Sequence, residues 1–272
     1  MIDSRNHVSA HIRFVLVNTS HPGNIGASAR AIATMGFSRL CLVAPHAFPH
    51  GEATALAAGA ANLLDAAVVS PDLVSAIADC QLVLGATVRR RGVALEELNP
   101  REAATRILAS AAQGEQVALL FGNERVGLDN DEIMHCHAAI TIPSDPACSS
   151  LNLAQAVQVV AWELRMAWLA GAAQTSSATF VSPAPHVETR DDPPASAAEL
   201  EGFFDHLAQA LDDIDFHKGR SPRTIMRRLR RFFLRAQPDQ RELHVLRGIL
   251  ADVIRTARIA REGGETLGSG KR

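Results

Sequence analysis

The chain lacks the features that would place it in a membrane or in an oxidising compartment. No apolar run approaches the length of a membrane span, and the N-terminus has no charged region, apolar core and small-residue cleavage site of a signal peptide. The cysteines show no disulfide-framework spacing: Cys41, Cys80, Cys136 and Cys148. We therefore expect a cytoplasmic protein that binds no membrane.

Signatures of several enzyme classes are missing as well. The dinucleotide-binding order Gly-x-Gly-x-x-Gly does not occur, and Gly268–Lys271 lacks the spacing and the following helix of a P-loop. There is no Gly-x-Ser-x-Gly elbow and no evident nucleophile–base pair. The run His135–His137 with Cys148 suggests zinc at first sight, but adjacent side chains point apart and no Cys-x-x-Cys occurs. We expect no metal.

A net charge of only -2 conceals a strong asymmetry near the C-terminus. The range Glu199–Asp215 contains acidic residues and no Lys or Arg, whereas Lys218–Arg261 contains 13 basic residues and 3 acidic ones. A solvated helix face is the simpler interpretation of such a run. Because arginine predominates and suits bidentate phosphate contacts, the pattern favours a nucleic-acid partner.

Short apolar runs flanked by breakers alternate with Ala-rich stretches. The runs predict strands at Ile12–Val17, Leu40–Val43, Ala66–Val69, Leu82–Leu84, Val117–Phe121 and Ala138–Ile142. The stretches predict helices at Ala27–Met35, Pro71–Asp79, Arg101–Ala112 and Leu151–Leu169. Because the strands are apolar throughout, both faces should be buried. This predicts an α/β fold with a mostly parallel sheet and helices on both faces.

The rest of the chain differs in composition and periodicity from the part before it. We predict a first domain at 1–170, a linker at 171–198, an all-α module at 199–262 and a flexible tail at 263–272. Ser221 and Pro222 predict the start of the module's second helix, with Ile225, Leu229 and Phe232 facing inward. Asp239 and Glu242 have the spacing of a capping box before the third helix.

Three polar segments follow predicted strands: Asn18–Arg30, Phe121–Leu128 and Ser149–Leu153. Ligands of open α/β sheets bind beyond the carboxyl ends of strands, so we expect these segments to form the walls of one pocket. Within them, Gly23, Gly26 and Gly122 would allow the backbone to approach a ligand closely. Two simpler readings stay open. Arg30 could be an ordinary exposed helix residue, and Glu124 could cap a helix beginning near Asp129.

Taken together, the three segments resemble, in order and spacing, the three motifs of TrmH-like RNA 2′-O-ribose methyltransferases of the SPOUT superfamily. The resemblance covers about Arg13–Ala170. Beyond the linker, Arg227–Ala236 and Glu242–Leu250 resemble the helical extension of the branch that methylates cytidine or uridine 32 in the tRNA anticodon loop.

The resemblance implies a deep C-terminal trefoil knot, an obligate homodimer, tRNA and not DNA as the partner, and S-adenosylmethionine as the cofactor. It implies a cofactor site at Ala86, Thr87, Val88, Gly122, Glu124, Ile142, Ser149, Ser150 and Leu151. The catalytic residues would be Asn18, Arg30, Ser150 and Asn152, with Arg30 serving the partner subunit's pocket. The tRNA would lie on Arg91, Arg227, Arg228, Arg230, Arg231 and Arg235.

The physical chemistry of methyl transfer agrees with this assignment. In-line displacement from a sulfonium mainly requires positioning of donor and acceptor. A ribose hydroxyl also needs its forming alkoxide stabilised, which the Arg30 guanidinium can do as a cation, although hardly as a base. Two alternatives stay open: a 2′-O-methyltransferase for another tRNA or rRNA site, and a non-catalytic RNA-binding protein that has lost its donor site.

Overall fold

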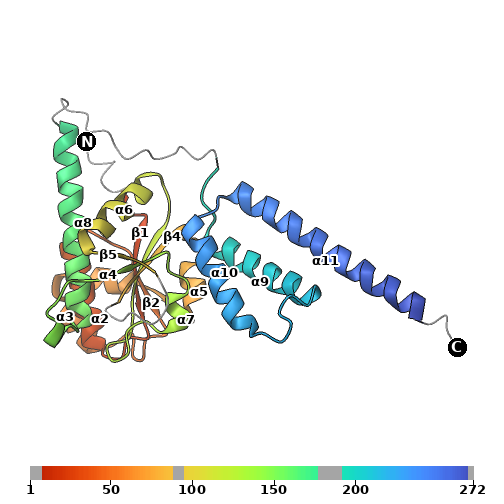
Figure 1. Cartoon of the computed structure of the whole chain (residues 1–272). Helices are drawn as coiled ribbons and strands as arrows, with labels where there is room; N and C mark the ends of the chain where they lie inside the picture. The colour runs from red at the N-terminus through yellow and green to blue at the C-terminus, as the bar shows by residue number, and fades with distance from the viewer. Residues whose placement is uncertain (1–7, 88–94, 177–191, 269–272) are drawn as a thin grey trace. The chain divides into compact units, whose positions relative to one another are not determined.

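The computed structural model describes residues 8–87, 95–176 and 192–268, and the chain divides into two compact units, Met1–Val187 and Glu188–Arg272 (Figure 1). The first unit alternates strands and helices. Its elements are β1 (Ile12–Val17), α2 (Pro22–Thr34), β2 (Leu40–Val43), α3 (Gly51–Ala57), η1 (Ala58–Ala60), α4 (Ala61–Asp65), β3 (Val68–Ser70), α5 (Leu73–Ile77), β4 (Leu82–Ala86), β5 (Glu96–Leu98), α6 (Pro100–Ala112), β6 (Val117–Phe121), α7 (Asn130–Ile133), β7 (Ala138–Ile140), η2 (Pro146–Cys148) and α8 (Leu153–Ser176).

The strands form one seven-stranded sheet in the order β3-β2-β1-β6-β4-β7-β5, and every pairing is parallel. The predicted parallel α/β sheet is thus confirmed, and β1, β2 and β6 occupy the predicted residues. The predicted strand at Ala66–Val69 is displaced to β3, because Ala66 and Ala67 instead close α4 through hydrogen bonds to Asn62 and Leu64.

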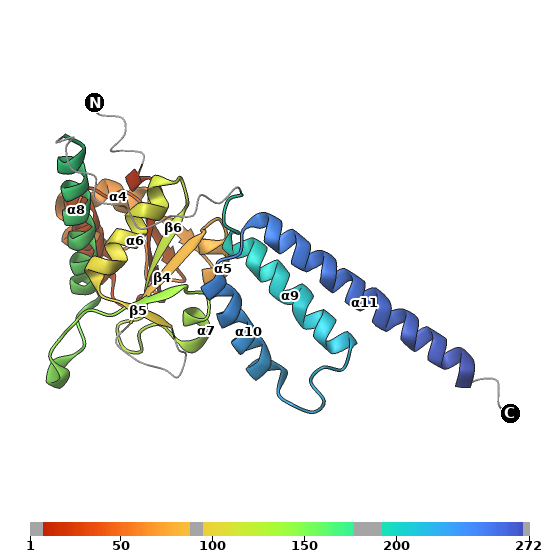
Figure 2. The ribbon, with the colours of Figure 1, turned by 45° about the horizontal axis from the view of Figure 1, so that its top comes forward.

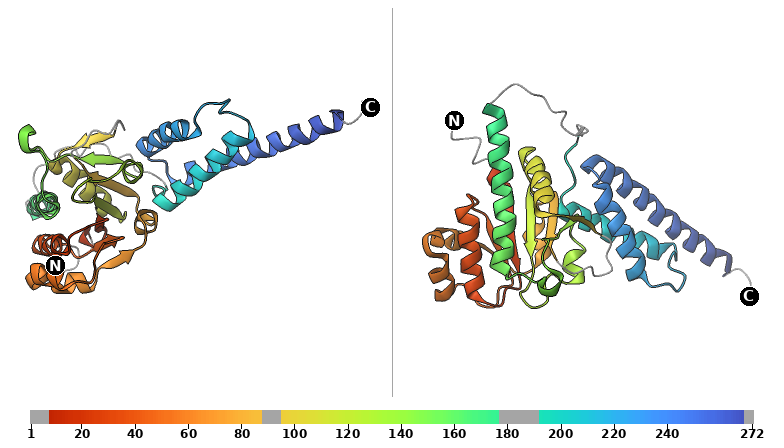
Figure 3. Two further views of the ribbon diagram at one scale, coloured as in Figure 1. Left: turned by 90° about the horizontal axis from the view of Figure 1, so that it is seen from below. Right: turned by 60° about the vertical axis from the view of Figure 1, so that its left-hand side comes forward.

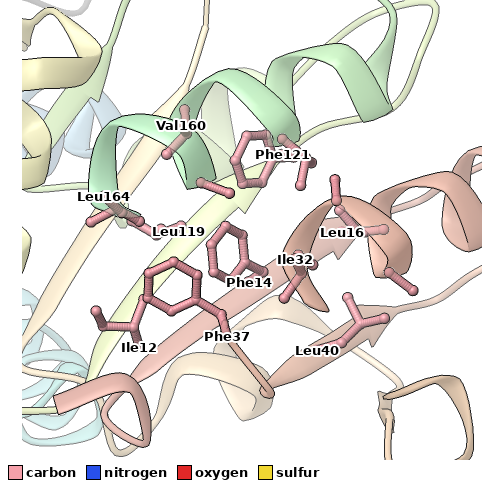
Figure 4. Close-up of a cluster of buried hydrophobic side chains, with 14 of the residues drawn as sticks. Ile12, Phe14, Leu16, Ile32, Phe37, Leu40, Leu119, Phe121, Val160 and Leu164 are labelled. Carbon is pink, nitrogen blue, oxygen red and sulfur yellow. The ribbon is translucent and has the colours of Figure 1, made fainter. Parts of the chain in front are cut away.

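Opposite faces of β1 contact different helices. Ile12, Phe14 and Leu16 pack into the main core, which also contains Val160 and Leu164 of α8 (Figure 4). Arg13 points to the other face, since successive strand residues alternate, and its guanidinium binds Asp79 just after α5 at 2.7 and 2.8 Å. Helices therefore lie on both faces, as predicted.

Two predicted ligand-facing glycines serve helix packing. Helices α2 and α8 lie side by side over the sheet, and α2 also packs on α3 (Figure 3). A Cβ on Gly26 would lie 2.1 Å from the Ala53 carbonyl oxygen of α3, and one on Gly23 would lie 2.7 Å from the Glu52 carboxylate. The interpretation of Gly23 and Gly26 as ligand contacts is therefore wrong, because the close approach is between two helices.

The second unit contains three helices, α9 (Ala197–Asp213), α10 (Pro222–Ala236) and α11 (Gln240–Gly268), of which α11 extends well beyond the other two (Figure 2). Phe203 and Phe204 of α9, Leu234 of α10 and Leu243 of α11 are buried together. The predicted capping box is confirmed: Asp239 accepts from the Glu242 amide at 2.7 Å, and Glu242 accepts from the Asp239 amide at 2.9 Å.

The predicted boundaries need correction. Helix α8 continues to Ser176, into the segment predicted as linker, because Ala172 and Ala173 are strong helix formers. At the other end of that segment, Ala195 belongs to the core of the second unit. Helix α11 likewise extends to Gly268 through part of the predicted tail, since propagating a helix is easier than starting one.

The sequence prediction that Phe232 of α10 faces inward is wrong. Phe232 is 54% exposed, whereas Phe233 packs edge-on against Phe203, with ring centroids 4.7 Å apart. The inward direction of α10 is therefore set by Phe233 and Leu234, one and two residues after the position that the sequence suggested.

No helix in the described part of the chain is long and apolar enough to cross a membrane.

Candidate active site

A cavity opens at the carboxyl ends of β4, β6 and β7. Its lining is Ala86, Thr87, Phe121, Gly122, Asn123, Glu124, Arg125, Val126, Gly127, Ile140, Ile142, Ser150, Leu151, Leu153 and Ala156. The aliphatic side chains come mainly from β7 and from the chain leading into α8. Hydroxyl, amide and carboxylate groups come from the other walls.

Seven of the nine residues predicted for the cofactor line this cavity: Ala86, Thr87, Gly122, Glu124, Ile142, Ser150 and Leu151. Ser149 is not among the lining residues, and Val88 and Arg91 fall outside the described residues. The second and third polar segments thus meet in one cavity, as the topology suggested. Their roles toward a cofactor stay predictions.

The sequence prediction named the segment Phe121–Leu128 as a wall of the pocket but singled out only Gly122 and Glu124 within it. Asn123, Arg125, Val126 and Gly127 line the cavity together with Gly122 and Glu124, so the whole loop after β6 forms this wall. The loop folds back on itself: the Gly127 amide donates to the Asn123 carbonyl at 2.7 Å, and the Arg125 amide donates to Asn123 Oδ1 at 2.9 Å. The position of the loop directly after a buried strand was the available signal.

Gly122 is required by this loop rather than by direct approach of a ligand. A Cβ at Gly122 would lie 2.1 Å from the Leu128 amide nitrogen and 2.2 Å from the Gly127 carbonyl carbon. Both atoms belong to the backbone and have no rotamer to escape into. Any side chain at position 122 must therefore displace the cavity wall.

Glu124 holds the start of α2. Its carboxylate accepts hydrogen bonds from the Ser20 amide at 2.9 Å, the His21 amide at 3.1 Å and Asn24 Nδ2 at 2.9 Å. Burial alone would raise the pKa of Glu124, but these hydrogen bonds stabilise the anion and hold the pKa below its ordinary value. The alternative that Glu124 caps a helix near Asp129 is wrong, because Asp129 and Glu132 cap that helix themselves.

Asn24 connects Glu124 with the third polar segment. Its Nδ2 donates to Glu124, and its Oδ1 accepts from Asn152 Nδ2 at 3.0 Å. Asn152 Oδ1 in turn accepts from the Ala154 amide at the start of α8, at 2.9 Å. One amide side chain therefore joins all three polar segments, although the sequence analysis did not select Asn24.

Asn18 lies at the end of β1 with a left-handed backbone, φ 53°. Its amide donates to the Val43 carbonyl at 2.9 Å, its carbonyl accepts from Asn123 Nδ2 at 2.7 Å, and its Nδ2 donates to Glu132 at 3.0 Å. Asn18 is thus held firmly beside the loop after β6, but it does not line the cavity.

Arg30 differs from the other predicted catalytic residues. It is exposed on α2, and within the described ranges no hydrogen bond or ion pair is formed by its guanidinium. Ser150 alone of the four predicted catalytic residues lines the cavity. A single subunit therefore does not bring Arg30 into the cavity wall.

The predicted tRNA-binding arginines of α10 fall into two groups. Arg227, Arg228 and Arg235 are exposed, and the described residues give their guanidinium groups no acidic partner. Arg230 is held by a bidentate ion pair with Glu201 and lies 4.3 Å from the Phe204 ring centroid. Arg230 is therefore a packing residue of the helical unit, and its contact with tRNA stays a prediction. Arg231 is half-buried.

The run His135–His137 has a structural explanation. His137 is buried, and its Nδ1 accepts from the Val83 amide of β4 at 3.1 Å. Cys136 is buried against the position of Gly85, where a Cβ would approach its Sγ to 2.8 Å. Among the described side chains, no group of three or more His, Cys, Asp and Glu is arranged to hold a metal ion.

Comparison with family models gives two matches. Residues 11–162 match the SpoU rRNA methylase family. Residues 198–262 match the C-terminal domain of the tRNA methyltransferase TrmJ. The two matches cover the two units of the structure separately.

Individual relatives match over nearly their whole length. A tRNA (cytidine/uridine/adenosine-2′-O-)-methyltransferase TrmJ of Pseudomonas aeruginosa is 45% identical over 91% of this chain and 95% of its own. A tRNA (cytidine/uridine-2′-O-)-methyltransferase TrmJ of Klebsiella pneumoniae is 46% identical over 89% of this chain and 96% of its own. The crystal structure of TrmJ from Z. mobilis superposes with a TM-score of 0.74 at 36% identity, covering 89% of this chain and 98% of that one.

Proposed function

The chain belongs to the SpoU methylase family of enzymes, and from this premise we propose that it transfers a methyl group from S-adenosylmethionine to the ribose 2′-hydroxyl of cytidine or uridine 32 in the tRNA anticodon loop. The names of the relatives support tRNA and the 2′-oxygen. The observation that carries the proposal is the cavity in which motif residues from separate segments meet, cross-linked through Asn24.

The donor set of the cavity suits S-adenosylmethionine. Ile140, Ile142 and Leu151 offer an apolar surface for a purine ring, and Thr87 and Ser150 offer hydroxyl groups for its polar parts. When bound, the cofactor supplies an electrophilic methyl group on a sulfonium. The loop Gly122–Gly127 forms one side of the cavity.

On the acceptor side, Arg30 stabilises the developing negative charge of the ribose oxygen. A guanidinium stays protonated in proteins, so it acts as a cation and hydrogen-bond donor, with an RNA phosphate to orient it. The side-chain amide of Asn18 donates to Glu132, and that of Asn152 donates to Asn24. These two hydrogen bonds hold the first and third polar segments in place. Such positioning is the main contribution a protein makes to an in-line displacement.

A homodimer explains why Arg30 lies outside its own cavity wall. Trp162, Met166 and Leu169 of α8 lie at i, i+4 and i+7 and are 49%, 42% and 47% exposed. An exposed apolar stripe of this kind suits a second copy of the chain. In such a dimer, Arg30 of one subunit serves the cavity of the other.

The deep trefoil knot implied by the resemblance also belongs to this proposal. It is supported by the position of β7, which is inserted between the two earlier strands β4 and β5. The extension contributes tRNA binding through the exposed Arg227, Arg228 and Arg235. A second candidate, an RNA-binding protein without catalysis, is disfavoured by the intact cavity.

The test uses the alkali resistance of 2′-O-methylated RNA. Alkaline cleavage needs a free 2′-hydroxyl, so tRNA methylated there with labelled donor should release its label in a dinucleotide that maps to position 32. Label in a mononucleotide would show base methylation and overturn the proposal. If no label enters the tRNA at saturating concentrations of donor and tRNA, the result would favour the non-catalytic candidate.

A further inference from the structure

The exposed Phe232 is unusual for its position. Phe232 is 54% exposed, whereas the two apolar residues that follow it on α10, Phe233 and Leu234, turn toward the core. Because Phe233 already fills the contact with Phe203 and Phe204, Phe232 adds little to the packing of the unit. An aromatic ring left in water on a short helix calls for a partner outside the chain.

Arginines flank this ring along one stripe of α10. Arg228 lies one turn before Phe232 and Arg235 one turn after it, so the three residues stand at i, i+4 and i+7. Seven residues of helix span about 10 Å. Both arginines are exposed, and in the part of the chain that the structure describes neither has an acidic partner.

The ring of Phe232 is also less occupied than comparable rings of the unit. The Phe204 ring carries the Arg230 guanidinium at 4.3 Å, and the Phe216 ring carries the Arg220 guanidinium at 5.4 Å. The described contacts of Phe232 include no cation over its face, and its ring meets Phe233 edge-on at 5.3 Å with an interplanar angle of 82°. Its exposed surface therefore stays open for stacking.

We propose that Phe232 is a stacking platform for one unpaired base of the tRNA, with Arg228 and Arg235 holding the phosphates on either side of that nucleotide. The inference rests on the proposed tRNA-binding role of the extension and adds to it a contact with a base. It commits the surface to a single-stranded loop nucleotide, since bases within a duplex already stack on one another.

Charge complementarity favours RNA over a protein partner. A protein docking on Phe232 would need acidic groups of its own placed to pair with both arginines, whereas a nucleotide brings an aromatic base and two phosphates together. The stripe therefore matches one nucleotide with its neighbouring phosphates in both charge and polarity.

The test is equilibrium binding of unmodified tRNA to the full-length protein over a range of salt concentrations. We expect Phe232→Ala to weaken binding by about 5- to 100-fold, the loss seen for one stacking contact. The slope of log affinity against log salt should stay unchanged, because stacking releases no counterions. Phe232→Trp should bind like the wild type, and Phe232→Leu should bind like Phe232→Ala.

Two further variants separate this inference from the proposed function. Arg228→Ala should reduce the salt slope by about 0.7 to 0.9, one phosphate contact. Phe216→Ala is the matched control, since that exposed ring is covered by Arg220, and it should leave tRNA affinity unchanged.

The outcomes are distinguishable. If Arg228→Ala changes the slope while Phe232→Ala binds normally, the platform is refuted and the proposed function stands. If neither variant changes tRNA binding, the tRNA-binding role of this helix falls as well. A change in oligomeric state with Phe232→Ala, at unchanged RNA affinity, would identify the ring as a protein contact and overturn the inference.

Discussion

The two units of the molecule treat their charged side chains in opposite ways. Around the cavity, Glu124 and Asn18 are paired within the chain: Glu124 accepts three hydrogen bonds, and Asn18 is fixed by Glu132. On α10, Arg227, Arg228 and Arg235 stand in water without an acidic partner among the described residues. The cavity is thus organised before any ligand arrives, while the extension keeps its cations available for a polyanion.

Each unit also contains one arginine that resembles the charged residues of the other unit. Arg30 of the sheet unit is exposed like the arginines of α10, and it is the residue proposed to meet RNA. Arg230 of the extension is committed to Glu201 and Phe204 like the residues around the cavity. The contacts that an arginine makes within the chain, rather than its place in the sequence, therefore distinguish the packing arginines from those proposed to meet RNA.

Arg30→Ala offers the largest expected effect. We expect turnover to fall by about 10²- to 10³-fold, because the charge on the forming alkoxide loses its stabilisation. Donor affinity, measured by calorimetry, should stay within about twofold, since Arg30 is assigned to the acceptor side. Arg30→Lys should restore little, because an ammonium lacks the guanidinium fork. Loss of donor affinity in Arg30→Ala would contradict the assignment.

Removal of the second unit tests whether the two regions are separable. A chain ending at Ser176, where α8 ends, should stay folded and bind the donor normally. Its tRNA affinity should fall by about tenfold or more, with a slope against salt lowered by about 0.7 to 0.9 for each lost phosphate contact. An unchanged slope would mean that the extension does not touch the RNA backbone.

Gly122→Ala tests the rigidity of the cavity wall. The added Cβ collides with backbone atoms of Gly127 and Leu128, so we expect about 1–3 kcal/mol lower stability and clearly weaker donor binding. Gly114→Asn is the matched control: that glycine has φ 84° with nothing within 4 Å of its added Cβ, it does not line the cavity, and Asn tolerates the left-handed region. Normal donor binding by Gly122→Ala would show that the loop is not a wall of the site.

Glu124→Gln tests the fixed pairing through its pH dependence. The folded pKa of Glu124 lies below the ordinary value of 4.5, so its stabilising contribution is complete above that pH and is lost as the pH falls through the folded pKa. At pH 7 we expect the variant to be about 1–2 kcal/mol less stable by denaturant unfolding.

This difference should shrink as the pH is lowered below 4.5. Glu96→Gln is the control, because Glu96 is an exposed partner of Arg106 in the described structure, and its effect at pH 7 should stay small. A constant difference between wild type and Glu124→Gln down to acidic pH would contradict the role given to the carboxylate.

The last prediction compares the stability of variants at two nearby arginines, Arg228 and Arg230. Arg230→Ala should lower stability by about 2 kcal/mol, because it removes the mostly buried ion pair with Glu201 and the cation over the Phe204 ring, and it should leave the salt slope of tRNA binding unchanged. Arg228→Ala should change stability by less than about 0.5 kcal/mol. Thermal or denaturant unfolding of both variants checks the prediction, and equal losses of stability would erase the distinction.

The parts of the fold that the sequence predicted well are those with uniform burial. Strands β1, β2 and β6 are interior strands with a neighbour on each side, so their apolar runs are continuous. Strand β5 escaped prediction because it is an edge strand whose Glu96 and Glu97 are exposed. Phe232 was placed inward because helical spacing alone cannot choose between adjacent phenylalanines.

For the site, the family resemblance located most of the cavity, but the partners of its side chains could not be read from the chain. The contacts of Glu124 with Ser20 and of Asn152 with Asn24 depend on which strands lie side by side. Periodicity reports the environment of one element at a time. It carries no information on pairing between distant segments.

The strand order described above has a consequence for how the protein is made. Asn24 and Asn152 are 128 residues apart, and Asn18 and Glu132 are 114 apart. At about 5 to 20 residues per second, the ribosome needs about 6 to 26 s after Asn24 to deliver its partner. For most of that interval β1 has no β6 beside it, and throughout it α2 has no α8 to cover it. The apolar surfaces that these elements bury stay uncovered until then, and the cavity, whose lining includes Ser150 and Leu151, is among the last parts of this domain to form.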